Sequence, residues 1–119
     1  METLLKYCYG NHPKSRKIRE LGRKCLLLLA ERGEMELLEL VKALGIKTER
    51  WKGYEKPVKT FYHVVNPLKE IQIIDSVKRR EGKKFKTIYY FTPEKFEANM
   101  RAFVKNTLEF FKEIREKKR

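Results

Sequence analysis

Apolar residues recur at helical spacing along most of the chain, and this spacing changes to a strand-like pattern only between residues 71 and 91. The helical spacing predicts five helices, over residues 2–9, 15–32, 36–44, 57–68 and 94–117. From Ile71 onward, β-branched and aromatic residues predominate, which predicts two strands. Gly82 between them suits the positive φ of a tight turn. We therefore expect an α+β fold that is mostly helical and contains a β-hairpin.

Two prolines bear on the limits of the fourth helix. Pro57 suits the first turn of a helix, where the missing N–H costs nothing, whereas Pro67 should kink or end the helix. The eleven residues 46–56 (IKTERWKGYEK) are expected to form a long loop. Trp51 and Tyr54 in this loop would either cover the core or lie exposed as a contact for nucleic acid or protein. We expect them to pack, because a lone tryptophan is more often buried.

The last helix carries an apolar seam with spacing 4-3-4-3-4, typical of helices that pair along their length. The seam consists of Phe96, Met100, Phe103, Thr107, Phe110 and Ile114. Phe111 lies beside it and widens the apolar face. Such a helix can pack across its own domain, but its apolar face is large for that purpose. The seam therefore predicts a homodimer, with parallel and antiparallel pairing both open. Earlier in the chain, Glu34 and Met35 could pair as a minimal first strand.

The net charge of +13 and the pI near 9.8 point to a polyanionic partner, either nucleic acid or an anionic membrane surface. The charge is densest in residues 71–92, which hold six basic and two acidic residues. No segment approaches 18 apolar residues, so no membrane span is expected. Glutamine occurs once and serine twice while Lys and Glu are abundant, a composition typical of hyperthermophile proteins. We expect a cytoplasmic, nucleoid-associated protein.

The order of helices followed by a cationic hairpin resembles the winged helix-turn-helix proteins that are common among small archaeal and archaeal-virus transcription regulators. The resemblance covers residues 15–92 and is best over Lys59–Ile74. It implies that helix 57–68 is a recognition helix and that hairpin 77–86 is the wing. The chain departs from the family in its eleven-residue connection before the recognition helix, where three or four residues are usual.

Three groups of residues are candidates for DNA contact. The residues of helix 57–68 that could contact bases or phosphates are Lys56, Lys59, Thr60, His63 and Asn66. The hairpin contributes Lys78, Arg79, Arg80, Lys83, Lys84 and Lys86. The start of helix 15–32 contributes Lys14, Arg16 and Lys17, whose charges run against the helix dipole. The simpler interpretation is a solvated helix face and a hairpin protected by charge from edge pairing.

Together these patterns predict a sequence-specific protein for double-stranded DNA, a homodimeric transcription regulator with a DNA-binding domain over 1–92 and a dimerisation helix over 93–119. RNA-binding or ribosome-associated winged helices and sequence-blind chromatin proteins are the alternatives. Two cysteines 17 residues apart make no zinc framework, although Cys8 and Cys25 could form a disulfide. No catalytic motif is present, and we expect no enzyme activity, metal, cofactor or small-molecule ligand.

Overall fold

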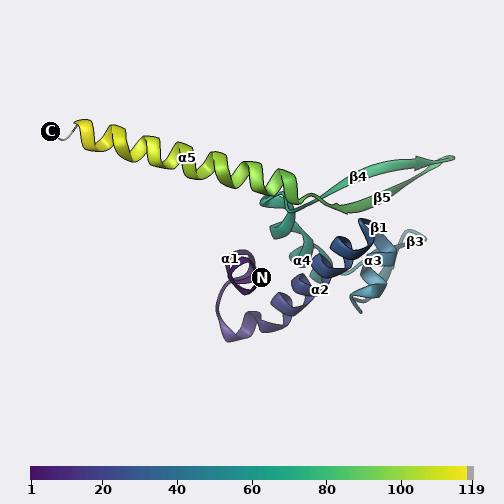
Figure 1. The fold of residues 1–119 in the computed structure, drawn as a ribbon. Coiled ribbons are helices and arrows are strands. Elements are labelled where there is room, and N and C mark those ends of the chain that lie inside the picture. Colours follow the sequence, from purple (N-terminus) through teal and green to yellow (C-terminus); the bar gives the residue numbers. More distant parts are fainter. Residues whose placement is uncertain (118–119) are drawn as a thin grey trace.

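The computed structural model describes residues 1–117 and shows an α+β chain that is mostly helical (Figure 1). Its elements are, in order, α1 (Glu2–Tyr9), a 3-10 turn η1 (Pro13–Ser15), α2 (Arg16–Arg32), β1 (Glu34–Glu36), α3 (Leu37–Ala43), β2 (Thr48–Trp51), β3 (Tyr54–Pro57), α4 (Lys59–Glu70), β4 (Ile74–Glu81), β5 (Lys84–Phe91) and α5 (Pro93–Lys117). The five helices predicted from apolar spacing are all present, with small shifts at their ends.

The core lies where α2, α3 and α4 meet the base of the β4–β5 hairpin. Helix α4 contributes most to it, because one whole side of this helix is apolar and buried: Phe61, Val64, Val65 and Leu68. The Phe61 ring meets the Tyr89 ring edge-on, with 5.6 Å between ring centroids. This contact joins α4 to strand β5 and orients the helix against the sheet.

A three-stranded antiparallel sheet is built in the order β1-β5-β4. Strand β1 pairs Glu34 with Tyr90 and Glu36 with Ile88, so the short first strand suggested by the sequence forms. Met35 between them is buried and attaches the sheet to the core. Strands β4 and β5 continue far beyond β1 as a two-stranded ribbon, which projects from the body (Figure 1).

The expected loop over residues 46–56 is instead a second hairpin, formed by β2 and β3. Trp51 pairs with Tyr54 across a two-residue turn of Lys52 and Gly53, whose φ angles are 49° and 84°. Positive φ at both central residues matches the twist of a tight hairpin, which explains why this turn closes. The predicted packing of Trp51 and Tyr54 is wrong, since 58% and 71% of their surfaces are exposed.

Pro57 does not begin the fourth helix, and Pro67 does not end it. Pro57 ends β3, and α4 starts two residues later at Lys59. Pro67 lies inside α4, which continues to Glu70. A proline this close to the end of a helix removes one backbone hydrogen bond, and the burial of the adjacent Leu68 holds the last turn against the core.

Helix α1 packs across α2 and α4 and is fixed there by one aromatic side chain. The Tyr9 ring lies directly over Gly22 of α2, and its hydroxyl donates a hydrogen bond to the Val64 carbonyl oxygen. Cys8 and Cys25 are both free, so the disulfide considered from the sequence is not formed. Burial raises the pKa of the Cys25 thiol to about 12, which keeps it protonated inside the core.

Helix α5 is attached to the body only at its start and then projects away from it (Figure 1). The Thr92 hydroxyl donates to the Gln72 carbonyl oxygen at 2.8 Å, and Lys95 forms an ion pair with Asp75 at 3.5 Å. Hydrogen bonding from the Ser76 N–H, then from Lys95, lowers the pKa of Asp75. Within residues 1–117, no helix combines the length and the apolar character needed to cross a membrane.

Candidate nucleic-acid interface

Four of the candidate residues lie together on the outer side of α4. Lys59, His63 and Asn66 are exposed because they occupy the helix face opposite the buried Phe61, and Thr60 is exposed beside this face. Lysines, hydroxyls, imidazoles and amides on an exposed helix are the groups that contact phosphates and base edges in a major groove. In the described structure these side chains are accessible to a ligand.

Lys56 lies elsewhere than the helical pattern predicts. It belongs to strand β3, where its ammonium group pairs with Glu49 at 3.5 Å and lies 5.0 Å from the centre of the Trp51 ring. The helical wheel placed it beside α4 because Pro57 suits the first turn of a helix, whereas Pro57 is the last residue of β3. Lys56 is therefore a residue of the β2–β3 hairpin.

A hollow of about 310 Å³ opens at the amino end of α4 and collects cations from separate segments. Lys17 of α2 and Thr60 of α4 both line it, as does Lys47, which precedes β2. The N-cap residue of α4 is Val58, whose side chain cannot cap the helix. The hollow therefore combines two cations with the apolar residues Leu21, Leu44 and Ile46, beside an amino end of α4 that has no side-chain cap.

Two other cations near the start of α2 have partners inside the chain, whereas the predicted contact residue Lys14 lies exposed in η1. Arg16 pairs with Glu20 one turn later at 3.4 Å. The Arg19 guanidinium donates to the carbonyl oxygens of Gly10 and His12 at 2.8 and 3.0 Å, which holds the connection between α1 and α2. The excess of positive charge at this helix end is thus partly structural, and Lys17 is the member that faces α4.

The six cations of the β4–β5 hairpin are all exposed, but they do not form one surface. Because side chains alternate along a strand, one face carries Arg79, Lys84 and Lys86, whereas the opposite face carries Lys78 and Arg80. Lys83 lies in the turn between the strands. The sequence shows the six cations, but their separation onto two faces follows from the strand register.

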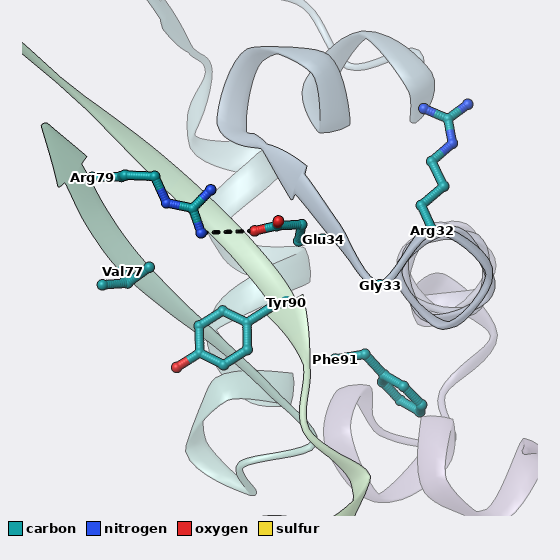
Figure 2. Close-up of a pocket in the computed structure, with 7 residues that line it drawn as sticks. All are labelled: Arg32, Gly33, Glu34, Val77, Arg79, Tyr90 and Phe91. Atoms are coloured by element: carbon teal, nitrogen blue, oxygen red, sulfur yellow. Dashed lines mark hydrogen bonds and ion pairs between the residues drawn. The ribbon is translucent and has the colours of Figure 1, made fainter. Parts of the chain in front are cut away.

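Two cations on the first of these faces are paired with carboxylates. Arg79 donates to Glu34 of β1 at 2.9 Å, beside a shallow hollow of about 500 Å³ at the base of the hairpin (Figure 2). Lys86 pairs with Glu81 at 2.9 Å, and this hydrogen bond raises the pKa of Lys86. To contact a phosphate, either cation would first have to release its carboxylate.

The carboxyl-terminal half of α4 is bordered by the N-terminal segment. His63 and Asn66 line a hollow of about 350 Å³ together with Cys8, Tyr9 and Ile18. The two polar residues are exposed at the rim of this hollow. The exposed face of α4 is therefore bordered, beside His63 and Asn66, by residues of α1 and α2.

Lys47 and the β2–β3 hairpin are the parts of this surface that sequence reasoning missed. The turn residues Lys52-Gly53 between two aromatic residues were the local signal of a hairpin. It was missed because the strands on either side are four residues long and carry no apolar alternation. No protein-family model matches this chain, and a search of curated proteins finds no relative.

Proposed function

We propose that the protein is a winged-helix protein that binds double-stranded DNA sequence-specifically, as a homodimer, and regulates transcription. The succession α2-β1-α3-α4-β4-β5 and the strand order β1-β5-β4 support the winged-helix assignment. In this proposal α4 lies in the major groove and the β4–β5 hairpin contacts the backbone or the adjacent minor groove.

The observation that carries the proposal is the cationic hollow at the amino end of α4. Lys17 and Thr60, which the sequence indicated separately as phosphate contacts, line the same hollow and are joined there by Lys47. A phosphate held in it would place the backbone of a duplex at the start of α4. Lys59 and His63 on the exposed face could then reach base edges in the adjoining groove.

The homodimer is supported by the exposed apolar stripe of α5. Phe96 packs against the core of its own chain, so its assignment to the dimer seam is not supported. From Phe103 onward the large apolar side chains are exposed, with 64% of the Phe103 surface and 57% of the Phe110 surface accessible. A helix with this seam and nothing covering it within residues 1–117 suits a second copy of itself.

To test this function, the protein is used to select the duplexes it binds best from a random-sequence pool. Fluorescence anisotropy then compares its affinity for a selected duplex with its affinity for a scrambled one. His63→Ala should cost about 1–3 kcal/mol on the enriched duplex and little on the scrambled one. The double variant Lys17→Ala/Lys47→Ala should weaken both and lower the slope of log affinity against log salt by roughly 2. Lys112→Ala on α5 removes a charge outside this surface and should leave binding unchanged.

Failure of the selection to enrich any sequence would contradict sequence-specific recognition and favour a chromatin protein. Tighter binding of structured RNA than of duplex DNA at matched salt, unaffected by His63→Ala, would favour the RNA-binding alternative, because the deep groove of A-form RNA does not admit a helix.

A further inference from the structure

The tip of the β2–β3 hairpin exposes two large aromatic side chains that have no structural task in the described chain. Trp51 and Tyr54 are opposite each other in the strand register, so both rings lie on the same face of the hairpin. They are 58% and 71% exposed and take no part in the core. Residues this apolar are seldom left at a hairpin tip unless they contact something else.

The hairpin holds these rings in a defined position. The turn of Lys52 and Gly53 has positive φ at both residues, the tight geometry that keeps paired strands in register. At the other end, the Val58 N–H donates to the Lys47 carbonyl oxygen at 3.2 Å, and the Thr48 hydroxyl donates to Glu55 at 2.9 Å. A ligand that meets the two rings therefore finds them already arranged, with little further loss of conformational freedom.

Cations surround the rings. The Lys56 ammonium lies 5.0 Å and the Lys52 ammonium 5.6 Å from the centre of the Trp51 ring. Residues 47–57 contain four basic and two acidic residues. The neighbours of the aromatic pair are thus charged, whereas the rings at a protein-binding surface are usually surrounded by further apolar side chains. Exposed aromatic rings with lysines beside them are typical of surfaces on which unpaired bases stack while phosphates meet the cations.

We propose that the tip of the β2–β3 hairpin binds an unpaired base of a nucleic acid by stacking on Trp51 and Tyr54, with Lys52 and Lys56 contacting the adjacent phosphates. This inference rests on the proposed function for its place beside a duplex, because the hairpin leads directly into α4. It adds a preference for duplex ends, overhangs or distorted sites, where a base is free to leave the stack.

The chain has a single tryptophan, so its fluorescence reports on this hairpin alone. The test titrates the full chain with a fully paired duplex and with the same duplex carrying a single-stranded thymidine overhang. Affinity is followed by anisotropy of a label on the DNA, and stacking by quenching of Trp51 emission. The parent should bind the overhang duplex about 5- to 150-fold more tightly than the paired one, with quenching only for the overhang.

Trp51→Ala should remove this difference in affinity, whereas Trp51→Phe should keep most of it because a phenyl ring still stacks. Tyr7→Ala is the matched control, since Tyr7 is an equally exposed aromatic residue on α1. Equal affinity of the parent for both duplexes, or quenching of the same size by heparin, which has no bases, would overturn stacking and leave duplex binding intact. Quenching by a free thymidine oligonucleotide without any duplex binding would retain the stacking site and contradict the proposed function instead.

Discussion

At the scale of single residues, the position of α1 depends on the absence of one side chain. A Cβ atom on Gly22 would lie 2.4–2.7 Å from atoms of the Tyr9 ring, closer than real Cβ contacts allow. Gly22 therefore lets the Tyr9 ring cross α2 and lets its hydroxyl reach the Val64 carbonyl oxygen of α4. The glycine is needed for close approach rather than for its backbone freedom.

We predict that Gly22→Ala lowers the free energy of unfolding by about 1–3 kcal/mol, because the ring must move away from α2. Urea unfolding followed by circular dichroism measures this change. In a Tyr9→Ala background the same substitution should stabilise the protein by about 0.5–1 kcal/mol, since alanine is the better residue in a helix interior. A similar loss in both backgrounds would show that the Tyr9 contact is not the cause.

The sequence predicts the features of single residues that depend on local periodicity, but not those that depend on contacts between distant segments. The exposure of Lys59 and His63 follows from helical periodicity, which the sequence carries locally. The pairing of Arg79 with Glu34 does not, because these residues lie 45 positions apart and meet only when β1 joins the sheet. The hollow shared by Lys17 and Thr60 likewise depends on how α2 packs on α4.

At the scale of elements, the two faces of the β4–β5 hairpin differ in how available their cations are. Arg79 and Lys86 on one face are bound to Glu34 and Glu81. Within residues 1–117, neither Lys78 nor Arg80 on the other face forms an ion pair with a carboxylate. A phosphate approaching the second face would not have to displace a carboxylate.

The double variant Lys78→Ala/Arg80→Ala should therefore weaken duplex binding more than Arg79→Ala/Lys86→Ala, although each removes two charges. We expect the first to lower the salt slope by about 2 and the second by less. Anisotropy titrations of one labelled duplex at several salt concentrations measure both slopes. Equal slopes for the two variants would mean that the intramolecular ion pairs do not limit phosphate contact.

Elements with a long, regular apolar pattern were the ones that the sequence could predict. The last helix, predicted over 94–117, is α5 from Pro93 to Lys117, because its apolar periodicity from Phe96 to Ile114 extends over about five turns. The β2–β3 hairpin was missed because its strands are four residues long and almost wholly exposed, so no apolar alternation marks them. Pro67 does not end α4, because the burial of Leu68 outweighs the local preference of proline against a helix.

At the scale of the whole molecule, α5 makes the chain elongated, with principal extents of 65 × 38 × 29 Å. Its exposed stripe includes Phe103, Val104, Leu108 and Phe110, a combination that a lone chain would present to water. Covering this stripe with the same stripe of a second chain would remove these side chains from water.

We predict that the protein sediments at twice the 14.4 kDa mass of one chain. Phe103→Asp/Phe110→Asp should shift it to the monomer, because carboxylates would be buried in the seam without partners. Ala102→Asp, which adds a charge outside the stripe, should leave the dimer intact. A monomeric parent at micromolar concentration in analytical ultracentrifugation would contradict the proposed pairing.

Gln72 gives the arrangement of these parts a further consequence. It adopts a φ of 61°, its carbonyl oxygen accepts from Thr92, and its side chain is hydrogen-bonded to Asn99. The residue that ends the turn after α4 thus also holds the first turns of α5, so the angle between the two helices is set by the folded chain instead of by a hinge. Two copies joined through α5 would hold their α4 helices at a fixed separation. Such a dimer would select DNA by the spacing of two half-sites as well as by their bases.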